Sequence, residues 1–244
     1  MYNFDYHIPM NAIAYHYAES SRMELVLSHA ARHYPWHIHA EHWTVGLVLA
    51  GSVTLGTKDA KRVLHRGEYF IVAPREAHWL EVAPQSSLAV LCIDTARLES
   101  TADDFSRLAS CATVLDTRDI VQLERLLPLT HSAPSSGDSS HFRSVIRRLI
   151  AAPEEAFSVP EMADLTGYSH WHFLRRFRAE TGLTPHAFQL ACRLRRARLL
   201  LRKNTAAADT AAAAGFADQS HMHKIFKLHH GLTPRQFLAA SFRS

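Results

Sequence analysis

The sequence predicts an α+β protein in which a β-rich N-terminal domain precedes an all-α domain. Two observations lead to this prediction. Residues 1–96 hold short runs of β-branched and aromatic residues separated by glycine and proline, which is typical of a β-sandwich or small barrel. Residues 141–244 hold a helical motif that occurs twice, 49 residues apart. At 244 residues the chain has room for two domains, each with its own core.

Six segments of the N-terminal domain have the composition of strands. The predicted strands are 23–28, 43–49, 53–56, 69–72, 79–82 and 88–93. Residues 97–130 turn helical, and an apolar stripe over 120–127 indicates either ordinary core or a dimerisation contact. Residues 131–140 are small and polar with proline and glycine, which predicts a linker.

The first copy of the repeated motif starts at residues 158–161, Ser-Val-Pro-Glu, a capping box with proline in the first turn. The short helix that follows ends at Gly167. Ser169 has the position of an N-cap for a second helix. Phe173 and Phe177, four residues apart, share one face of that helix, so we expect both to be buried.

The second copy has the same parts. Asp218 replaces Ser169 as the N-cap, Met222 and Phe226 replace the buried pair, and Gly-Leu-Thr-Pro follows each second helix. Asn204 or Thr205 is expected to open its first helix. A helix, a glycine turn and a capped second helix make the helix-turn-helix plan. Two copies predict two such units, which a long arginine-rich helix over residues 187–201 joins.

The net charge of +4 is unevenly distributed. Residues 141–244 carry 16 Lys/Arg against 7 Asp/Glu, whereas residues 1–140 carry 11 against 16. This balance indicates nucleic acid as the partner of the C-terminal domain only.

The three cysteines are too far apart for a CxxC site, which favours reduced thiols in a cytosol. The N-terminus lacks the pattern of a signal peptide, in which basic residues precede an apolar run, and no segment reaches 18 apolar residues. We therefore expect a cytoplasmic protein without membrane spans.

In a helix-turn-helix unit the second helix is the recognition helix, which reads DNA. In the first unit this helix, which follows Ser169, is expected to expose Trp171, Leu174, Arg175 and Arg178 together. The Arg175 guanidinium can hold guanine O6 and N7, Trp171 can pack on a thymine methyl or a sugar, and Leu174 offers apolar contact. Partial burial of Trp171 is the alternative. Arg178 and Arg202 are expected at phosphate or in solvent rather than at bases.

On the second recognition helix the corresponding face carries Gln219, Ser220, His223, Lys224 and Lys227. Glutamine can pair with adenine, and the lysines suit phosphate or guanine.

Histidines are concentrated in the N-terminal domain. His37 and His39 point to one side of a strand because side chains alternate, Glu41 continues that face, and His78 on another strand closes the set. Three imidazoles and a carboxylate suit zinc, nickel, cobalt or non-haem iron. The same histidines could instead surround an organic effector without metal. His229 and His230 are expected on the surface, where they bind metal weakly.

Residues 141–244 resemble the DNA-binding domain of the AraC/XylS family of bacterial transcription regulators. The matching positions are Gly-Tyr-Ser-x-Trp-His at 167–172, Phe177, Glu-Thr-Gly at 180–182, Arg193, Leu194, Ala197, Gly215, Phe216, Asp218, Phe226, Lys227, Gly231 and Pro234. Two features depart from the family pattern: Arg176 replaces an apolar residue, and residues 206–214 are almost all alanine.

The segments around His37 and at 74–78 resemble the cupin-type sensor domain of the same regulators. Trp43 and Thr44 stand where the cupin signature expects an acidic residue. The resemblance implies a fold of a cupin-like β-barrel or sandwich followed by two helix-turn-helix units. It also implies a non-enzymatic activator that binds promoter DNA, responds to a small-molecule or metal effector, contacts RNA polymerase and forms a homodimer. The alternatives are a cupin-type metalloenzyme fused to a DNA-binding module, and a nucleoid protein without sequence preference.

Overall fold

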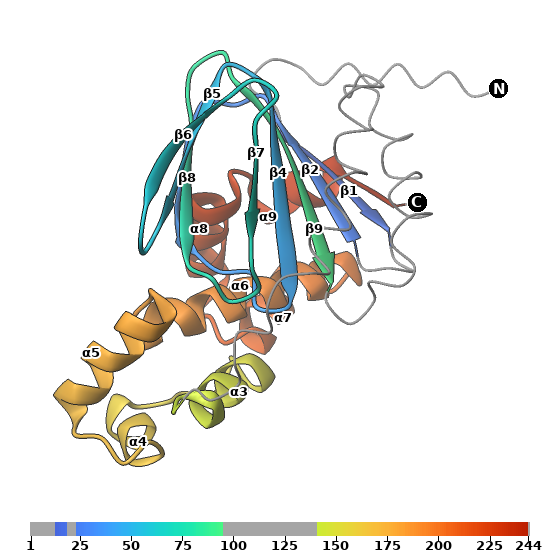
Figure 1. Ribbon diagram of the computed structural model, residues 1–244. Coiled ribbons are helices and arrows are strands. Elements are labelled where there is room, and N and C mark those ends of the chain that lie inside the picture. Colours follow the sequence, from blue (N-terminus) through green and yellow to red (C-terminus); the bar gives the residue numbers. More distant parts are fainter. Residues whose placement is uncertain (1–12, 19–22, 95–140, 244) are drawn as a thin grey trace.

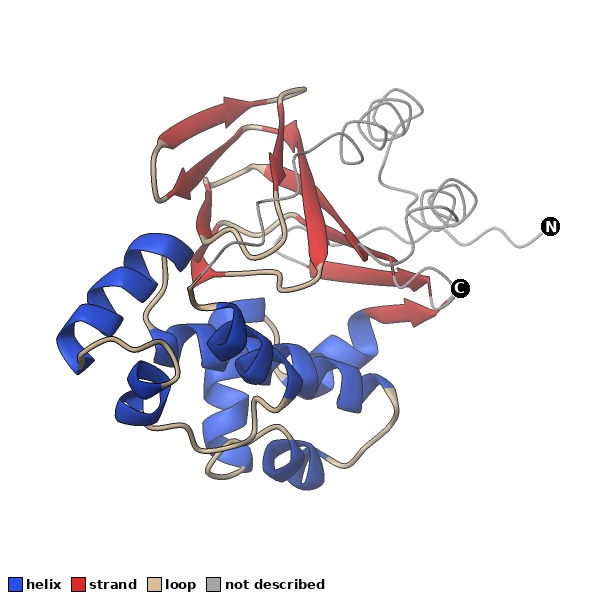
Figure 2. Ribbon diagram, turned by 60° about the horizontal axis from the view of Figure 1, so that its bottom comes forward, coloured by secondary structure: helices blue, strands red, loops and turns tan. Residues whose placement is uncertain are grey.

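The N-terminal domain of the computed structural model is a sandwich of two β-sheets (Figures 1 and 2). The structure describes residues 13–18, 23–94 and 141–243. Sheet A has the order β10-β1-β2-β9-β4-β7, and sheet B has the order β3-β8-β5-β6. In sheet A the strands are β1 (Ile13–Ala18), β2 (Met23–Ser28), β4 (His42–Ala50), β7 (Tyr69–Val72), β9 (Ser87–Asp94) and β10 (Ser241–Arg243). In sheet B they are β3 (Arg32–His37), β5 (Ser52–Thr57), β6 (Lys61–His65) and β8 (His78–Val82).

The pairing explains how one chain makes both sheets. Among the described strands each neighbouring pair is antiparallel except β1 and β10, which are parallel. Apolar side chains from both sheets fill the space between them, as alternation along each strand requires. They include Val48, Val53, Leu55, Leu64, Phe70, Val72, Leu80, Val82 and Leu88.

All six predicted strands are confirmed, with ends that shift by at most one residue. The sequence prediction missed β1, β3, β6 and β10. Strand β3, Arg-His-Tyr-Pro-Trp-His, carries a proline, which a strand tolerates at the edge of a sheet, where β3 lies. Strand β6 is the other edge of sheet B and buries Leu64 alone, so it shows no apolar alternation.

The C-terminal domain is helical and contains two helix-turn-helix units. Helices α4 (Val159–Asp164) and α5 (His170–Thr181) form the first unit, and α7 (Ala207–Ala213) and α8 (Gln219–His230) form the second. Helix α6 (Pro185–Arg202) joins them, α3 (Arg143–Ala151) precedes them and α9 (Pro234–Ala240) follows. The predicted repeat and its joining helix are confirmed.

The helix ends follow local rules with two exceptions. Ser158 and Glu161 form the predicted capping box, and the Asp218 carboxylate accepts from the backbone N–H of His221 at 2.7 Å. Ser169 is the N-cap of α5, but its side chain makes no capping hydrogen bond there. Helix α7 starts after Ala206, so the prediction of Asn204 or Thr205 is wrong.

The reason for the late start of α7 lies in the backbone. Asn204 has φ of 60°, the left-handed conformation, and its N–H donates to Leu201 at 2.9 Å. It therefore belongs to the end of α6.

Each unit has a core of the predicted residues. Phe173 and Phe177 are fully buried and contact Phe142, while Met222 and Phe226 are fully buried beside Phe237. Residues 97–130 and the predicted linker 131–140 lie outside the described residues. In the described part of the chain, none of the helices has the length and apolar character needed to cross a membrane.

The two domains pack closely against each other. Helix α6 runs beneath the sandwich, α8 contacts β3 and α9 contacts β1 (Figure 1). Apolar residues of the sandwich extend the helical cores: Ile13 and Tyr15 join the core of the second unit, and Ile38 and Ala77 join the core of the first.

Candidate effector site and DNA-binding surface

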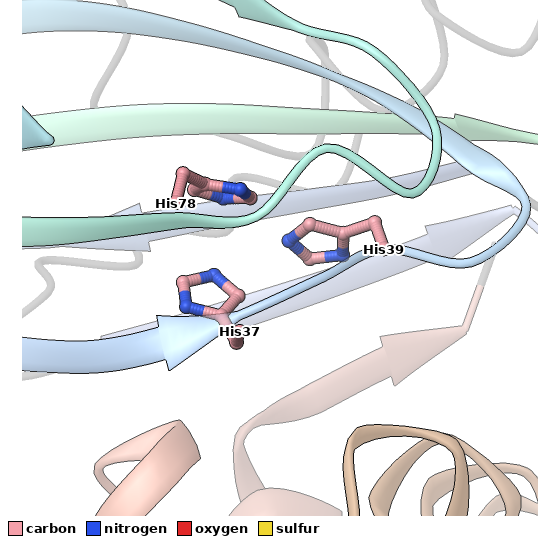
Figure 3. A group of neighbouring side chains, drawn as sticks. All are labelled: His37, His39 and His78. Carbon is pink, nitrogen blue, oxygen red and sulfur yellow. The ribbon is translucent and has the colours of Figure 1, made fainter. Parts of the chain in front are cut away.

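Three histidines of the sandwich meet beside helices α6 and α8. His37 ends β3 and His78 begins β8, and the two residues are partners in the strand register. His39 follows two residues after His37. The possible ligand atoms of the three side chains all lie within 4.8 Å of one another, and the rings face a common space (Figure 3). The structure thus brings together the three histidines that the sequence pattern selected.

Hydrogen bonds orient two of these rings. The Nδ1 atom of His37 donates to the carbonyl oxygen of Pro35 at 2.7 Å, and Nδ1 of His78 donates to that of Glu76 at 3.0 Å. A carbonyl oxygen can only accept, so Nδ1 carries the proton and Nε2 keeps its lone pair. Nε2 of His78 is buried and makes no hydrogen bond with the described residues. Histidines that bind metals have this arrangement, with the distal N–H fixed by a carbonyl.

Desolvation favours the neutral form of all three imidazoles, of which His78 is fully buried and His37 and His39 are half-buried. Desolvation lowers the pKa of His37 and His39 well below 6.5, and mutual repulsion among the histidines lowers both further. Desolvation also lowers the pKa of His78 to about 4, against a smaller opposing effect of its bond to Glu76. A neutral imidazole is the form that binds a metal ion or accepts a hydrogen bond from an effector.

The structure does not bring Glu41 into this cluster. Strand β3 ends at His37, so the alternation that was expected to carry Glu41 to the same face does not continue. Its carboxylate forms an ion pair with Arg195 of α6 instead. The prediction of a carboxylate as fourth group is therefore corrected.

The three histidines line a partly open cavity between the two domains, and residues of both domains form its walls. Its volume is about 130 Å³. By the measure in which one water molecule needs about 10–15 Å³, roughly ten waters or a small organic molecule would fit. The sandwich contributes an apolar lining with the histidines, and the helical domain contributes Arg195, Arg198, His229 and His230. His229 and His230, expected on the surface, lie at the end of α8 against this cavity.

A buried ion pair stands at the same interface. Glu24 of β2 binds Arg198 and Arg202 of α6, with an N–O distance of 2.5 Å to Arg202. Burial alone would raise the pKa of Glu24, but the two guanidiniums outweigh it and hold the pKa below its ordinary value. The prediction that Arg202 serves phosphate or solvent is wrong, because it faces the sandwich. Part of the basic charge of the C-terminal domain is thus neutralised within the molecule.

The predicted DNA-reading residues of α5 mostly lie on its surface. Trp171 is 81% exposed, so the alternative of partial burial is wrong, and Arg175 and Arg178 are exposed. Leu174 is half-buried against the core of the first unit. The face that includes Arg175 is therefore open to a partner.

On α8 the picture is similar. The four predicted residues other than His223 are exposed: Gln219, Ser220, Lys224 and Lys227. His223 is half-buried, and its Nε2 has no hydrogen bond with the described residues.

Comparisons with known proteins agree with this architecture. The family model for a helix-turn-helix domain matches residues 162–240, and the model for a cupin domain matches residues 24–94. The transcriptional regulator MtrA of Neisseria gonorrhoeae is 32% identical over 94 residues, which are 38% of this chain and 31% of MtrA. The regulator YbfI of Bacillus subtilis is 24% identical over 224 residues, 78% of this chain and 81% of YbfI. The chain thus spans about a third of MtrA but most of YbfI.

Further matches extend the comparison. The probable transcription factor PqrA of Proteus vulgaris is 33% identical over 84 residues, 34% of this chain and 69% of PqrA. Among solved structures, ToxT of Vibrio cholerae has a TM-score of 0.59 at 10% identity and covers 91% of this chain and 98% of its own, which shows the same fold. One structure of ToxT holds an unsaturated fatty acid. The chain belongs to the AraC/XylS family of helix-turn-helix transcription regulators, with a cupin-type domain before its DNA-binding domain.

Proposed function

We propose that the protein controls transcription from promoters through a ligand held in the cavity between its two domains, and that this ligand includes a divalent transition metal. The arrangement of His37, His39 and His78 carries the proposal. Their ligand atoms lie within 4.8 Å of one another, and Nε2 of His78 is buried without a hydrogen bond to the described residues. A group that fills this space satisfies the buried nitrogen, whose desolvation otherwise costs free energy.

The donor set selects the kind of metal. Three neutral imidazoles without a carboxylate favour zinc, nickel or cobalt over magnesium or calcium, which prefer oxygen. Three protein ligands also leave a coordination position for a group that is not part of the protein. When bound, the ion supplies a positive charge and a Lewis-acid site beside the apolar lining of the cavity.

An organic effector without metal is the second candidate, and the cavity itself favours it. The lining combines apolar side chains such as Val26 and Leu88 with donors such as Arg198. Such a cavity suits a molecule with an apolar body and one polar end.

Calorimetric titration distinguishes the two candidates. Nickel, cobalt and zinc are titrated into the wild-type protein and into the double variants His37→Ala/His39→Ala and His33→Ala/His65→Ala. The second pair is the control, because both histidines are exposed on the same domain outside the cluster. We expect a tight site of one ion per chain that the cluster variant loses and the control keeps. Equal metal affinity in the two double variants would rule out the three-histidine site. No metal binding to the wild-type protein would favour the organic effector.

For DNA binding, we propose that α5 and α8 enter successive major-groove segments on one face of the duplex. The exposed residues of both helices and the joining helix α6 support this. Recognition helices that read one face are about 34 Å, one helical turn, apart. Footprinting should show two protected segments, and protection of a single one would leave only one working helix.

Family membership supports the remaining proposals. We expect a homodimer in the cytoplasm that activates transcription through contact with RNA polymerase and has no enzymatic activity of its own. Sedimentation of the protein bound to a single operator would measure the number of chains.

A further inference from the structure

Residues 32–39 contact the second recognition helix, contribute to the core of the first helix-turn-helix unit, and provide two of the three clustered histidines. We name this stretch, β3 with the two residues after it, the ligand strand. At its first residue, the Arg32 guanidinium donates to the carbonyl oxygens of Lys227 and Leu228, each at 2.7 Å. These carbonyls lie in the last turn of α8, where the helix dipole favours a cation, and the Lys227 carbonyl also accepts from the backbone N–H of Gly231. The start of the ligand strand thus holds the end of the second recognition helix.

The other end of the ligand strand enters the first helix-turn-helix unit. Ile38 is 7% exposed and belongs to the core that contains Phe173 and Phe177 of α5. The rings of His37 and His39, on either side of Ile38, lie in the cluster (Figure 3). Consecutive side chains therefore alternate between the cluster and the recognition unit.

The third clustered histidine, His78, also has a neighbour in the chain that packs into the core of the first helix-turn-helix unit. Ala77, directly before His78, is 3% exposed and belongs to the same helical core. It lies against Gly182, which ends α5 with φ of 76°, a conformation that favours glycine. A Cβ on Gly182 would stand 2.6 Å from the Cβ of Ala77, so helix end and sandwich are in direct contact.

We infer that Ile38, Ala77 and Arg32 are positioning residues, through which the state of the three-histidine cluster sets the placement of both recognition helices. The inference rests on the proposed function, in which the cluster holds a metal ion. Nitrogen ligands of one tetrahedral zinc ion lie about 3.3 Å apart, given Zn–N bonds of about 2.0–2.1 Å. The ligand atoms here lie within 4.8 Å of one another, so we expect binding to draw them closer together, and with them the ligand strand and the start of β8. The packed cores on their far side transmit this shift, because close-packed interiors do not absorb it locally.

Such a connection makes metal and DNA affinities interdependent. If the two states of the cluster place α5 and α8 differently, zinc changes the affinity for DNA by a factor typically between about 5 and 150, and DNA changes the affinity for zinc by the same factor. Loss of a positioning residue removes this factor and leaves the ligands intact.

The test measures the linkage in the full chain. A duplex selected from a random library by the wild-type protein is titrated with and without zinc, and the ratio of the two Kd values is the readout. The variants are Ile38→Ala and Arg32→Ala, of which the second removes a half-buried side chain that bonds to the end of α8. Leu64→Ala is the control for lost packing, because Leu64 is fully buried in the sandwich core away from the helices. Zinc affinity of each variant is measured by calorimetry.

We expect a ratio of at least about fivefold in the wild type and in Leu64→Ala. In Ile38→Ala and Arg32→Ala the ratio of the two Kd values should fall below about half of the wild-type ratio, while each variant still binds one zinc ion per chain. If Ile38→Ala does not fold, Ile38→Val should give an intermediate ratio.

Three results decide against parts of this scheme. Variants that bind zinc and keep the wild-type ratio would overturn the inference and leave the metal site standing. A wild type that binds zinc with a ratio of one would do the same. A wild type that binds no zinc would overturn the metal part of the proposed function and the inference together.

Discussion

Replacing Glu24 by glutamine should loosen the two domains from each other. The carboxylate is 7% exposed, and its partners Arg198 and Arg202 are 15% and 11% exposed. Glutamine keeps the shape and one acceptor oxygen but leaves two buried guanidiniums without a counter-charge. Removal of one partner from a buried ion pair costs about 3–5 kcal/mol, and the retained acceptor places this change near the lower value, about 3 kcal/mol.

Calorimetry of the full chain at pH 7 measures this effect. For a chain of about 150–250 residues, 1 kcal/mol corresponds to a shift in Tm of about 2–4 °C. We therefore expect the transition that includes the interface to fall by about 6–12 °C. Glu155→Gln is the matched control: Glu155 pairs with Arg148, both side chains are half exposed, and such pairs contribute about 0–1 kcal/mol.

The same variant has a pH signature. The pKa of Glu24 is lower in the folded protein than the ordinary value of 4.5, so its stabilisation is present above pH 4.5 and is lost as the pH falls through the folded pKa. Glu24→Gln should lack this component of acid sensitivity. A variant that melts within 2 °C of the wild type, or that loses stability in acid as steeply, would refute the role given to this ion pair.

Four further predictions follow. Arg175→Ala should weaken binding to the selected duplex by about 1–3 kcal/mol and relax the choice at one base pair, and equal weakening on all sequences would contradict base reading. Burial lowers the pKa of His78 to about 4, so zinc binding measured by calorimetry should persist as the pH falls below 6.5 and should be lost only as the pH approaches 4. Loss of half of the zinc binding at pH 6.5 would contradict the lowered pKa. Ser158→Ala should cost about 1 kcal/mol in chemical denaturation, whereas Ser169→Ala, which loses no capping hydrogen bond in the structure, should cost less. Limited proteolysis should cut first within residues 131–140, and an initial cut inside the sandwich would contradict a linker there.

Local chemistry explains why the helical domain could be predicted from the sequence. The capping box at Ser158, the Asp218 cap and the buried pairs such as Phe173 and Phe177 depend on residues three or four positions apart. Strands β2, β4 and β9 were equally readable, because they are buried on both faces and therefore consist of nearly continuous apolar runs. The edge strand β3 was missed since its proline and histidines have no strand signature, although it carries His37, and His39 follows directly after it.

The site was predictable where it depends on strand alternation and not where it depends on the other domain. His37 and His39 were selected as neighbours on one face, and the structure brings them to His78. The partner of Glu41 is Arg195, 154 positions away, and no short-range pattern indicates that pair. The same holds for Arg202 with Glu24, 178 positions apart. Charge counts treated those arginines as free for DNA, because composition does not contain domain contacts.

The pairing of β10 with β1 attaches the C-terminal end of the helical domain to sheet A, so a rotation of this domain would turn about that strand. Backbone hydrogen bonds join Ser241–Arg243 to the edge of sheet A, in a parallel ladder that does not depend on side-chain identity. Figure 1 shows this strand at one end of the helical domain and α4 and α5 at the other. A rotation about β10 therefore moves α5 along a longer arc than α9. Because Ile38 and Ala77 belong to the core of the first helix-turn-helix unit, a shift passed through them would act on the helices that such a rotation moves farthest.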